Sequence, residues 1–164
     1  MISLTDQSNV PKILCDQSLE DSAHWLRAAG YDVQVPAAKL SDLQLYDIAQ
    51  NEQRVLIINQ DYVQDIPLES NSVLLVDSPL VFEQIKQIGK NLRIDWLYRP
   101  LSRCMLCNTE LTDLNINKWI VLPQSMQNNT VTSHGCPSCK RIYWAGDEVN
   151  RMVFQLQSFK RLEW

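Results

Sequence analysis

Two pairs of cysteines with the spacing of metal ligands lie in the second half of the sequence. They are Cys104-Met-Leu-Cys107 and Cys136-Pro-Ser-Cys139, and 28 residues separate the pairs. A CxxC pair turns two thiolates onto one ion, and two pairs supply the four ligands of a tetrahedral structural Zn²⁺ site. An iron centre and a redox dithiol are the alternatives, although a redox pair is expected to lead a helix in a βαβ unit. We predict that these four cysteines bind zinc.

A second group of residues that could do chemistry consists of aspartates. Asp16, Asp61 and Asp77 each stand at or just beyond the end of a short apolar run, and Asp42 opens a predicted helix. Ligands of an open parallel sheet bind beyond the carboxyl ends of its strands, so these acids are expected to converge. Converging carboxylates need a cation, and Mg²⁺ or Mn²⁺ is the natural partner for oxygen ligands. Such an ion usually serves phosphate chemistry.

The aspartates also have a purely structural interpretation. Aspartate after a strand is a common helix cap or turn residue, because its side chain bonds to nearby backbone amides. Asp77 fits this alternative well, since it precedes Ser78 and Pro79 at the expected start of a helix.

The elements that must position these residues follow from the pattern of apolar residues. Short runs rich in Val, Ile and Leu without strict alternation are typical of strands buried on both faces. Helical patterns separate them, which predicts an α/β domain with a mainly parallel sheet and flanking helices. Residues 92–98 are left open as a last strand or an edge piece. The predicted strands cover residues 13–15, 33–35, 55–58 and 73–76, and the predicted helices cover 18–29, 41–53 and 79–88.

The helix boundaries have their own sequence signals. Ser18 begins a capping-box pattern, and Gly30 stands where a left-handed residue would end that helix. Ser78 and Pro79 are expected as the N-cap and first residue of the last helix, with Gly89 after its end.

We predict two modules, an α/β domain over residues 11–98 and a zinc-ribbon module over residues 99–164. Residues 1–98 hold 7 basic and 14 acidic residues, a net −7, whereas residues 99–164 hold 8 and 5, a net +3. A hairpin at residues 119–122 would fit between the cysteine pairs. In the ribbon, Tyr143 and Trp144 could stack on bases and Arg151 could contact phosphate, or the two aromatic residues could form the ribbon's own small core.

Composition bounds the class of protein. The chain has 164 residues and a net charge of −4, which suits one domain with a small appendage and weighs against a protein that coats nucleic acid. No apolar run approaches the roughly 18 residues of a membrane span. The first ten residues lack the basic start and apolar stretch of a signal peptide, so we expect a cytoplasmic protein without membrane contact.

Several motifs in order resemble the Mut-seven C-terminal ribonuclease domain family. A helix with Trp25-Leu-Arg27 ends in Ala29-Gly-Tyr-Asp32, and Arg103-Cys-x-x-Cys-Asn108 follows later. The last motif is Cys-Pro-x-Cys-x-x-x-Tyr-Trp-x-Gly. The matching stretches are residues 14–32, 41–61, 103–111 and 135–152.

The resemblance implies a PIN-like nuclease fold joined to a zinc ribbon, and metal-dependent cleavage of RNA by Asp16, Asp42 and Asp61. This chain has Asn59-Gln60-Asp61 where the family usually carries Thr-Arg-Asp, so one basic residue is absent. The alternative is therefore a catalytically weakened protein of the same fold that binds RNA or a protein partner as an adaptor. A nuclease toxin with an antitoxin partner is a third option.

Overall fold

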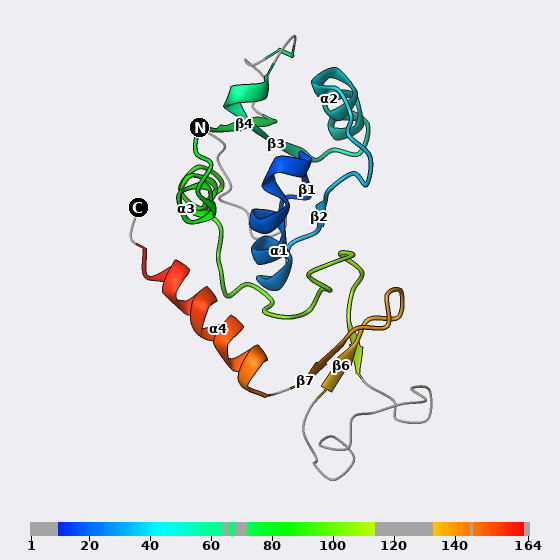
Figure 1. The fold of residues 1–164 in the computed structure, drawn as a ribbon, viewed down its shortest axis with the longest axis vertical. Coiled ribbons are helices and arrows are strands. Elements are labelled where there is room, and N and C mark those ends of the chain that lie inside the picture. Colours follow the sequence, from blue (N-terminus) through cyan, green and yellow to red (C-terminus); the bar gives the residue numbers. More distant parts are fainter. Residues whose placement is uncertain (1–9, 64–65, 68–71, 114–132, 145, 163–164) are drawn as a thin grey trace.

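The chain folds around a four-stranded parallel sheet with helices on both faces (Figure 1). The computed structural model describes residues 10–63, 66–67, 72–113, 133–144 and 146–162. The strand order is β2-β1-β3-β4, and every neighbouring pair is parallel, as predicted. The strands are β1 (Ile13–Cys15), β2 (Val33–Gln34), β3 (Val55–Asn59) and β4 (Val73–Val76).

Alternation of side chains along the central strands produces two apolar layers. Ile13 and Cys15 of β1 pack with Ile57 of β3 under α1 (Glu20–Ala28) and α3 (Val81–Leu92). Leu14 points the other way and packs with α2 (Asp42–Asn51). Because both faces are covered, the strands are apolar on both sides and lack the alternation of a half-exposed sheet.

The first helix ends where the sequence signals predict, but it begins with a different cap. The helical path starts as the 3₁₀ helix η1 (Gln17–Leu19), and its cap is the carboxylate of Asp16 in place of the expected Ser18. At the other end Gly30 is left-handed as predicted, with φ of 102°. A Cβ at Gly30 would lie 2.5 Å from the carbonyl oxygen of Arg99, so the position also requires glycine for close backbone approach.

The second helix matches its prediction closely. Ser41 caps α2 in a reciprocal capping box with Gln44, which satisfies two backbone amides at once. Leu45 and Ala49 are buried against the sheet.

The predicted boundaries of the third helix were wrong. α3 begins at Val81 after Leu80, and Gly89 lies buried inside the helix. The left-handed cap is Arg93, with φ of 51°. Ser78 instead closes a local turn, because its hydroxyl accepts a hydrogen bond from the amide of Leu80 at 3.2 Å. Residues 92–98 contain no strand; Leu92 ends α3, and the irregular segment after it buries Trp96.

The cysteine module is built on a second, antiparallel sheet. Its order is β5 (Thr112–Asp113), β6 (Ser133–Gly135) and β7 (Ile142–Trp144). An isolated bridge between Arg103 and Glu110 precedes it. Residues 103–113 and 133–144 together make up the cysteine module. The hairpin predicted at residues 119–122 lies outside the described residues.

A C-terminal helix, α4 (Asp147–Lys160), follows the cysteine module and returns to the main domain. Figure 1 shows it beside α1 and α3. Leu156 and Phe159 join the apolar core of the sheet. The ring of Phe159 meets Trp25 edge-on, with the centroids 5.3 Å apart, and also meets Trp96 at 5.2 Å. Residues of both predicted modules therefore share one core.

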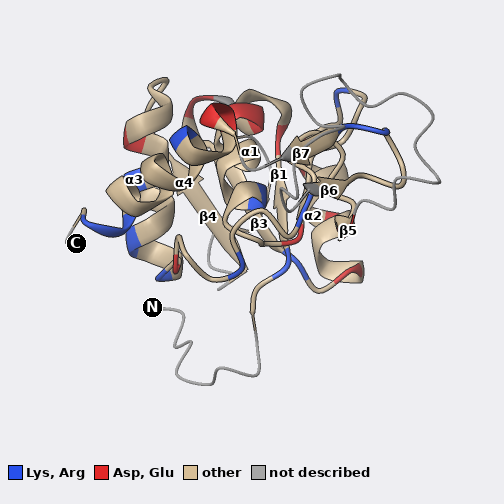
Figure 2. Cartoon of the chain, turned by 90° about the horizontal axis from the view of Figure 1, so that it is seen from below, with Lys and Arg blue, Asp and Glu red and all other residues tan. Residues whose placement is uncertain are grey.

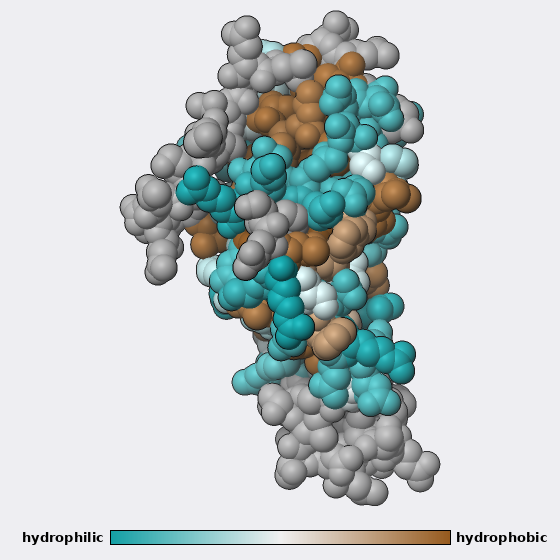
Figure 3. Space-filling model, turned by 90° about the vertical axis from the view of Figure 1, so that its left-hand side faces the viewer, coloured by the Kyte–Doolittle hydropathy of each residue, from teal (hydrophilic) through white to brown (hydrophobic). Residues whose placement is uncertain are grey.

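The described surface carries mixed charge and broken apolar patches. Figure 2 shows acidic and basic positions spread over the sheet domain and the cysteine module. Polar side chains separate the apolar patches on the side shown in Figure 3. Within the described residues, no helix has the length and apolar character required to cross a membrane.

Candidate metal centre and acidic sheet edge

The structure brings the four predicted cysteine ligands together. All four sulfur atoms lie within 4.8 Å of one another. The Sγ atoms of Cys104 and Cys139 are 3.5 Å apart, and those of Cys107 and Cys136 are 3.3 Å apart. These separations exceed the roughly 2.05 Å of a disulfide and approach the roughly 3.8 Å edge of a tetrahedron with Zn–S bonds of about 2.3 Å. The cluster can hold a zinc ion.

Each CxxC pair lies in a turn of the same construction. The amide after each second cysteine bonds back to the carbonyl of the first, from Asn108 to Cys104 at 2.9 Å and from Lys140 to Cys136 at 3.0 Å. Asn108 and Lys140 are both left-handed, with φ of 66° and 63°. We call these turns knuckle 1 (residues 104–108) and knuckle 2 (residues 136–140). Their matching backbone aims four sulfurs at one point.

The thiol environment fits a cation site. Burial opposes ionisation of Cys107, but hydrogen bonds with Thr109 outweigh it and lower its pKa to about 6. Burial, together with hydrogen bonds to the neighbouring cysteines, raises the pKa of Cys139 to about 12. The four thiols cannot all ionise so close together unless a cation compensates their charge, which is the chemistry a divalent ion supplies to thiolates.

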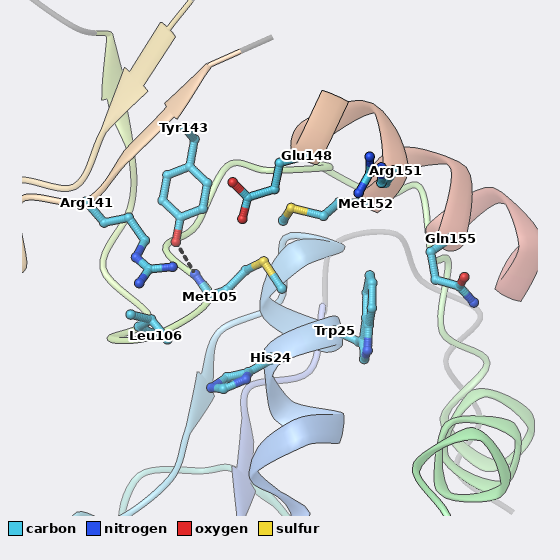
Figure 4. Close-up of a pocket in the computed structure, with 10 residues that line it drawn as sticks. All are labelled: His24, Trp25, Met105, Leu106, Arg141, Tyr143, Glu148, Arg151, Met152 and Gln155. Atoms are coloured by element: carbon cyan, nitrogen blue, oxygen red, sulfur yellow. Dashed lines mark hydrogen bonds between the residues drawn. The ribbon is translucent and has the colours of Figure 1, made fainter. Parts of the chain in front are cut away.

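Tyr143 belongs to this cluster. It is buried, and its hydroxyl accepts a hydrogen bond from the amide of Met105 at 3.1 Å, drawn in Figure 4. That leaves the hydroxyl proton for the sulfur of Cys104, at 3.3 Å. Burial and the neighbouring Cys104 raise the pKa of Tyr143, so it stays protonated and can donate. This position fits the structural alternative, in which Tyr143 is core to the ribbon.

A buried arginine anchors knuckle 1 to the main domain. The side chain of Arg27, in α1, is 3% exposed. Its Nη1 donates to the carbonyls of Met105 and Leu106 at 2.9 and 2.8 Å, and its Nε donates to the carbonyl of Val33 at 2.8 Å. One planar guanidinium thus satisfies carbonyls of both the knuckle and β2, which a lysine could not do.

A second link runs from knuckle 1 through Asp32. The amide of Asn108 donates to Asp32 at 2.7 Å, and its oxygen accepts from the backbone amide of Val33 at 3.0 Å. Arg54 forms an ion pair with the same Asp32 carboxylate at 3.0 Å. Burial alone would raise the pKa of Asp32, but the hydrogen bonds from Arg54 and Asn108 outweigh it and hold the pKa below its usual value.

Asp16 and Asp61 follow neighbouring strands, and Asn59 connects them. Oδ2 of Asp16 accepts from the backbone amide of Asn59 at 2.8 Å. The Asn59 side chain in turn accepts from the backbone amide of Asp61 at 3.1 Å, at the start of the 3₁₀ helix η2 (Gln60–Tyr62). Oδ1 of Asp16 also accepts from the amide of Ser18 at 2.7 Å. Asp16 therefore caps η1 while it holds the end of β3.

The other two predicted acids lie around this edge. Asp77 follows β4, the strand next to β3, and its carboxylate is hydrogen-bonded to the amide of Gln87. Asp42 is the first residue of α2 and is half-buried. Within the described ranges, the cysteine cluster is the one place where three or more potential metal ligands lie within 4.8 Å. The four aspartates share an edge of the sheet without forming such a cluster.

Arg151 and Trp144 are the remaining residues predicted to contact RNA. Arg151 is exposed on α4. Trp144 ends β7, but its side chain lies outside the described part of the structure.

Sequence reasoning missed several residues that build the site. Arg27 stands between the buried Leu26 and Ala28, and a charged residue within an apolar helix face is the signal that could have marked it. Asn59 carried no comparable signal, because its role depends on which strand lies beside β3.

Comparison with known proteins gives a match to a protein family. The family model described as the Mut7-C RNAse domain matches residues 11–156, which include both the acidic sheet edge and the cysteine cluster. No curated protein and no solved structure matches the chain significantly.

Proposed function

The chain belongs to the Mut7-C RNAse domain family, and from this we propose that it is a ribonuclease that depends on a divalent cation. Asp16 and Asp61 would hold Mg²⁺ or Mn²⁺, with Asp42 beside them and Asp77 as a weaker fourth. Mg²⁺ is commonly held by one or two carboxylates together with water and substrate phosphate, so a pair of aspartates is sufficient. When bound, such an ion supplies activated water and charge stabilisation at phosphorus.

The observation that carries this assignment is the connection through Asn59. Asp16 and Asp61 are joined through its backbone amide and its side-chain oxygen, at 2.8 and 3.1 Å. Asn59 is 6% exposed, so both links are largely shielded from water. This arrangement supports a role for the two carboxylates at neighbouring strand ends, where the ligands of open parallel sheets bind. Oδ1 of Asp16 is also bonded to Ser18, so its orientation is fixed before any ion arrives.

The test is cleavage of labelled single-stranded RNA by zinc-loaded protein, with and without added Mn²⁺. Asp16→Asn and Asp61→Asn should each reduce the cleavage rate by at least ~100-fold, which corresponds to roughly 2.7 kcal/mol of transition-state stabilisation. Asparagine remains a good helix cap and can keep the hydrogen bond from Ser18, but it loses the one from Asn59, so Asp16→Asn should fold with a loss of about 1–3 kcal/mol. Asp47→Asn, an exposed acid within α2, is the matched control and should cleave like the wild type.

The second candidate is an adaptor of the same fold that binds RNA or protein without cleaving. Gln60 stands where the resembled motif usually has arginine, and Glu20 and Asp21 make the first turn of α1 acidic. Both features weaken attraction for phosphate. If folded, zinc-loaded protein binds RNA or a protein partner but cuts no RNA, the adaptor replaces the nuclease.

We also propose that the four cysteines hold one structural Zn²⁺. Their sulfurs are close enough for a single ion, and the matching knuckles support a closed four-ligand site. Zinc measured per purified chain should be one equivalent, and Cys107→Ser should lower it. Ser138→Ala, inside knuckle 2 but without a ligand atom, is the control and should keep its zinc. Iron or a disulfide in the purified protein would overturn the zinc assignment.

A further inference from the structure

A cleft of about 440 Å³ lies where α1, the cysteine module and α4 meet (Figure 4). Trp25 enters it from α1, Met105 from knuckle 1 and Met152 from α4. Arg141 stands on one side in Figure 4, and Arg151 stands on the other. Clefts that bind small organic groups commonly measure roughly 300–1,000 Å³, so this one suits a single nucleotide.

The apolar part of the cleft is suited to a flat aromatic ring. Trp25 is half-buried, and its edge-on contact with Phe159 fixes the orientation of its indole ring. Met105 and Met152 place polarizable thioethers in the same space, and such side chains make favourable contacts with aromatic rings. Stacking of a base on an aromatic side chain tolerates any of the four bases, because each has a π-face.

The charged part of the cleft is suited to phosphate. Arg141 and Arg151 are exposed, and within the described residues neither guanidinium forms an ion pair. Glu148 is the acidic residue of the lining, so these three residues give a net charge of +1 in a chain whose total is −4. An oxygen of Glu148 could accept from an exocyclic amino group or a ribose hydroxyl.

We propose that this cleft binds one unpaired nucleotide of a single-stranded RNA, with the base against Trp25 and phosphates at Arg141 and Arg151. The base must be unpaired, because a half-buried indole cannot reach the face of a base inside a duplex. This inference rests on the proposed function, which supplies RNA as the ligand. It adds a binding subsite that is separate from the sheet edge with Asp16 and Asp61. α1 begins at Glu20, close to that edge. Trp25 lies five residues further along the helix, which is about 7.5 Å along its axis.

The first test is the affinity of full-length, zinc-loaded protein for fluorescein-labelled oligouridine, measured by fluorescence anisotropy without added divalent cation. Arg141→Gln Arg151→Gln should weaken binding at least ~10-fold and reduce the slope of log affinity against log salt by roughly 0.7 for each lost contact. The control, Lys90→Gln Arg161→Gln, removes the same charge at two exposed residues outside the cleft and should change affinity by less than ~2-fold. Equal weakening by the two double variants would overturn the subsite.

The second test needs no substitution. Oligouridine that contains 4-thiouridine is cross-linked by light to the wild-type protein, and the adducts are located by mass spectrometry. We expect adducts on the peptides that contain Met105 or Met152. Adducts found only on the peptide that contains Asp61, or no binding by the wild type, would overturn the inference.

These tests are separate from the test of the nuclease. Binding that persists in the Asp16→Asn Asp61→Asn double variant supports the cleft even if that protein, like the wild type, cuts nothing. Cleavage that is unaffected by Arg141→Gln Arg151→Gln at limiting RNA counts against the cleft and leaves the nuclease intact.

Discussion

The side-chain amide of Asn108 donates a hydrogen bond to the carboxylate of Asp32 over 2.7 Å, across a sequence separation of 76 residues. This contact fastens knuckle 1 to the connection between α1 and β2. Asn108 follows the last cysteine of one motif that resembles the ribonuclease family, and Asp32 ends another. Arg27, from the Trp-Leu-Arg motif, makes the adjacent link. Residues from these three motifs therefore join the cysteine module to the sheet domain.

Replacing Asn108 should loosen this joint. Asn108→Ala removes the bonds to Asp32 and Val33 and places alanine in a left-handed conformation, so we expect a loss of about 2–3 kcal/mol in the free energy of unfolding. Urea unfolding of the zinc-loaded protein measures this loss. Lys140→Ala is the control, since it has the same left-handed backbone in knuckle 2. A loss no larger than that of Lys140→Ala would mean that the Asn108 side chain contributes little.

Arg27 should not tolerate lysine. A lysine keeps the charge but cannot present the fork that reaches Val33, Met105 and Leu106 together. We expect Arg27→Lys to lower the unfolding free energy by about 3 kcal/mol, because buried carbonyls lose their partner. Thermal unfolding with zinc present is the measurement, and Arg161→Lys at an exposed site serves as control. Equal stability of the two variants would show that the buried guanidinium is not required.

We expect that no residue with a side chain can replace Gly30 without a loss of stability. In Gly30→Ala the new methyl group would lie 2.5 Å from the carbonyl oxygen of Arg99, at a φ of 102°. We expect a loss of more than ~2 kcal/mol from backbone strain and displacement of the Arg99 segment. Gly146→Ala, at a φ of −132°, strains no backbone and should lose only the difference between glycine and alanine as N-cap, roughly 0.5–1 kcal/mol. Chemical denaturation of both variants measures the two losses in unfolding free energy. A loss at Gly30 no larger than that at Gly146 would contradict the close approach of Gly30 to Arg99.

Stability should depend on pH through His24. Burial lowers the pKa of His24 below 6.5, and the nearby Arg27 lowers it further. Below pH 6.5 the unfolded chain therefore binds more protons than the folded one, so stability falls as the pH drops from 6.5 toward the folded-state pKa. His24→Gln should flatten this part of the curve of unfolding midpoint against pH. A curve with the same slope in wild type and variant would exclude His24 as the source.

The sequence predicted the sheet well because its signals are local. Each strand is a short apolar run, and burial on both faces leaves little room for another interpretation of residues 13–15 or 73–76. The cysteine site was equally predictable, since spacing alone pairs the ligands. Gly30 was recognisable because few other residues adopt its backbone conformation.

The errors fall where the structure depends on distant contacts. Gly89 has the appearance of a helix end, yet packing of Ile88 and Leu92 carries α3 past it to Arg93. α4 was not predicted, although Val149, Met152, Leu156 and Phe159 recur at helical spacing. The partner of Asp16 is a backbone amide at the end of β3. Only strand order brings that amide near, and strand order has no local signal.

The contact of Phe159 with Trp25 and Trp96 also sets an order of folding. On the ribosome, α1 and α3 emerge well before α4, so the apolar surface that α4 covers stays open while the cysteine module is synthesised. The contacts that close this core are non-local, and such contacts form slowly. Completion of the core therefore follows synthesis of the cysteine module, and until α4 packs, both tryptophans lack the cover that Phe159 provides.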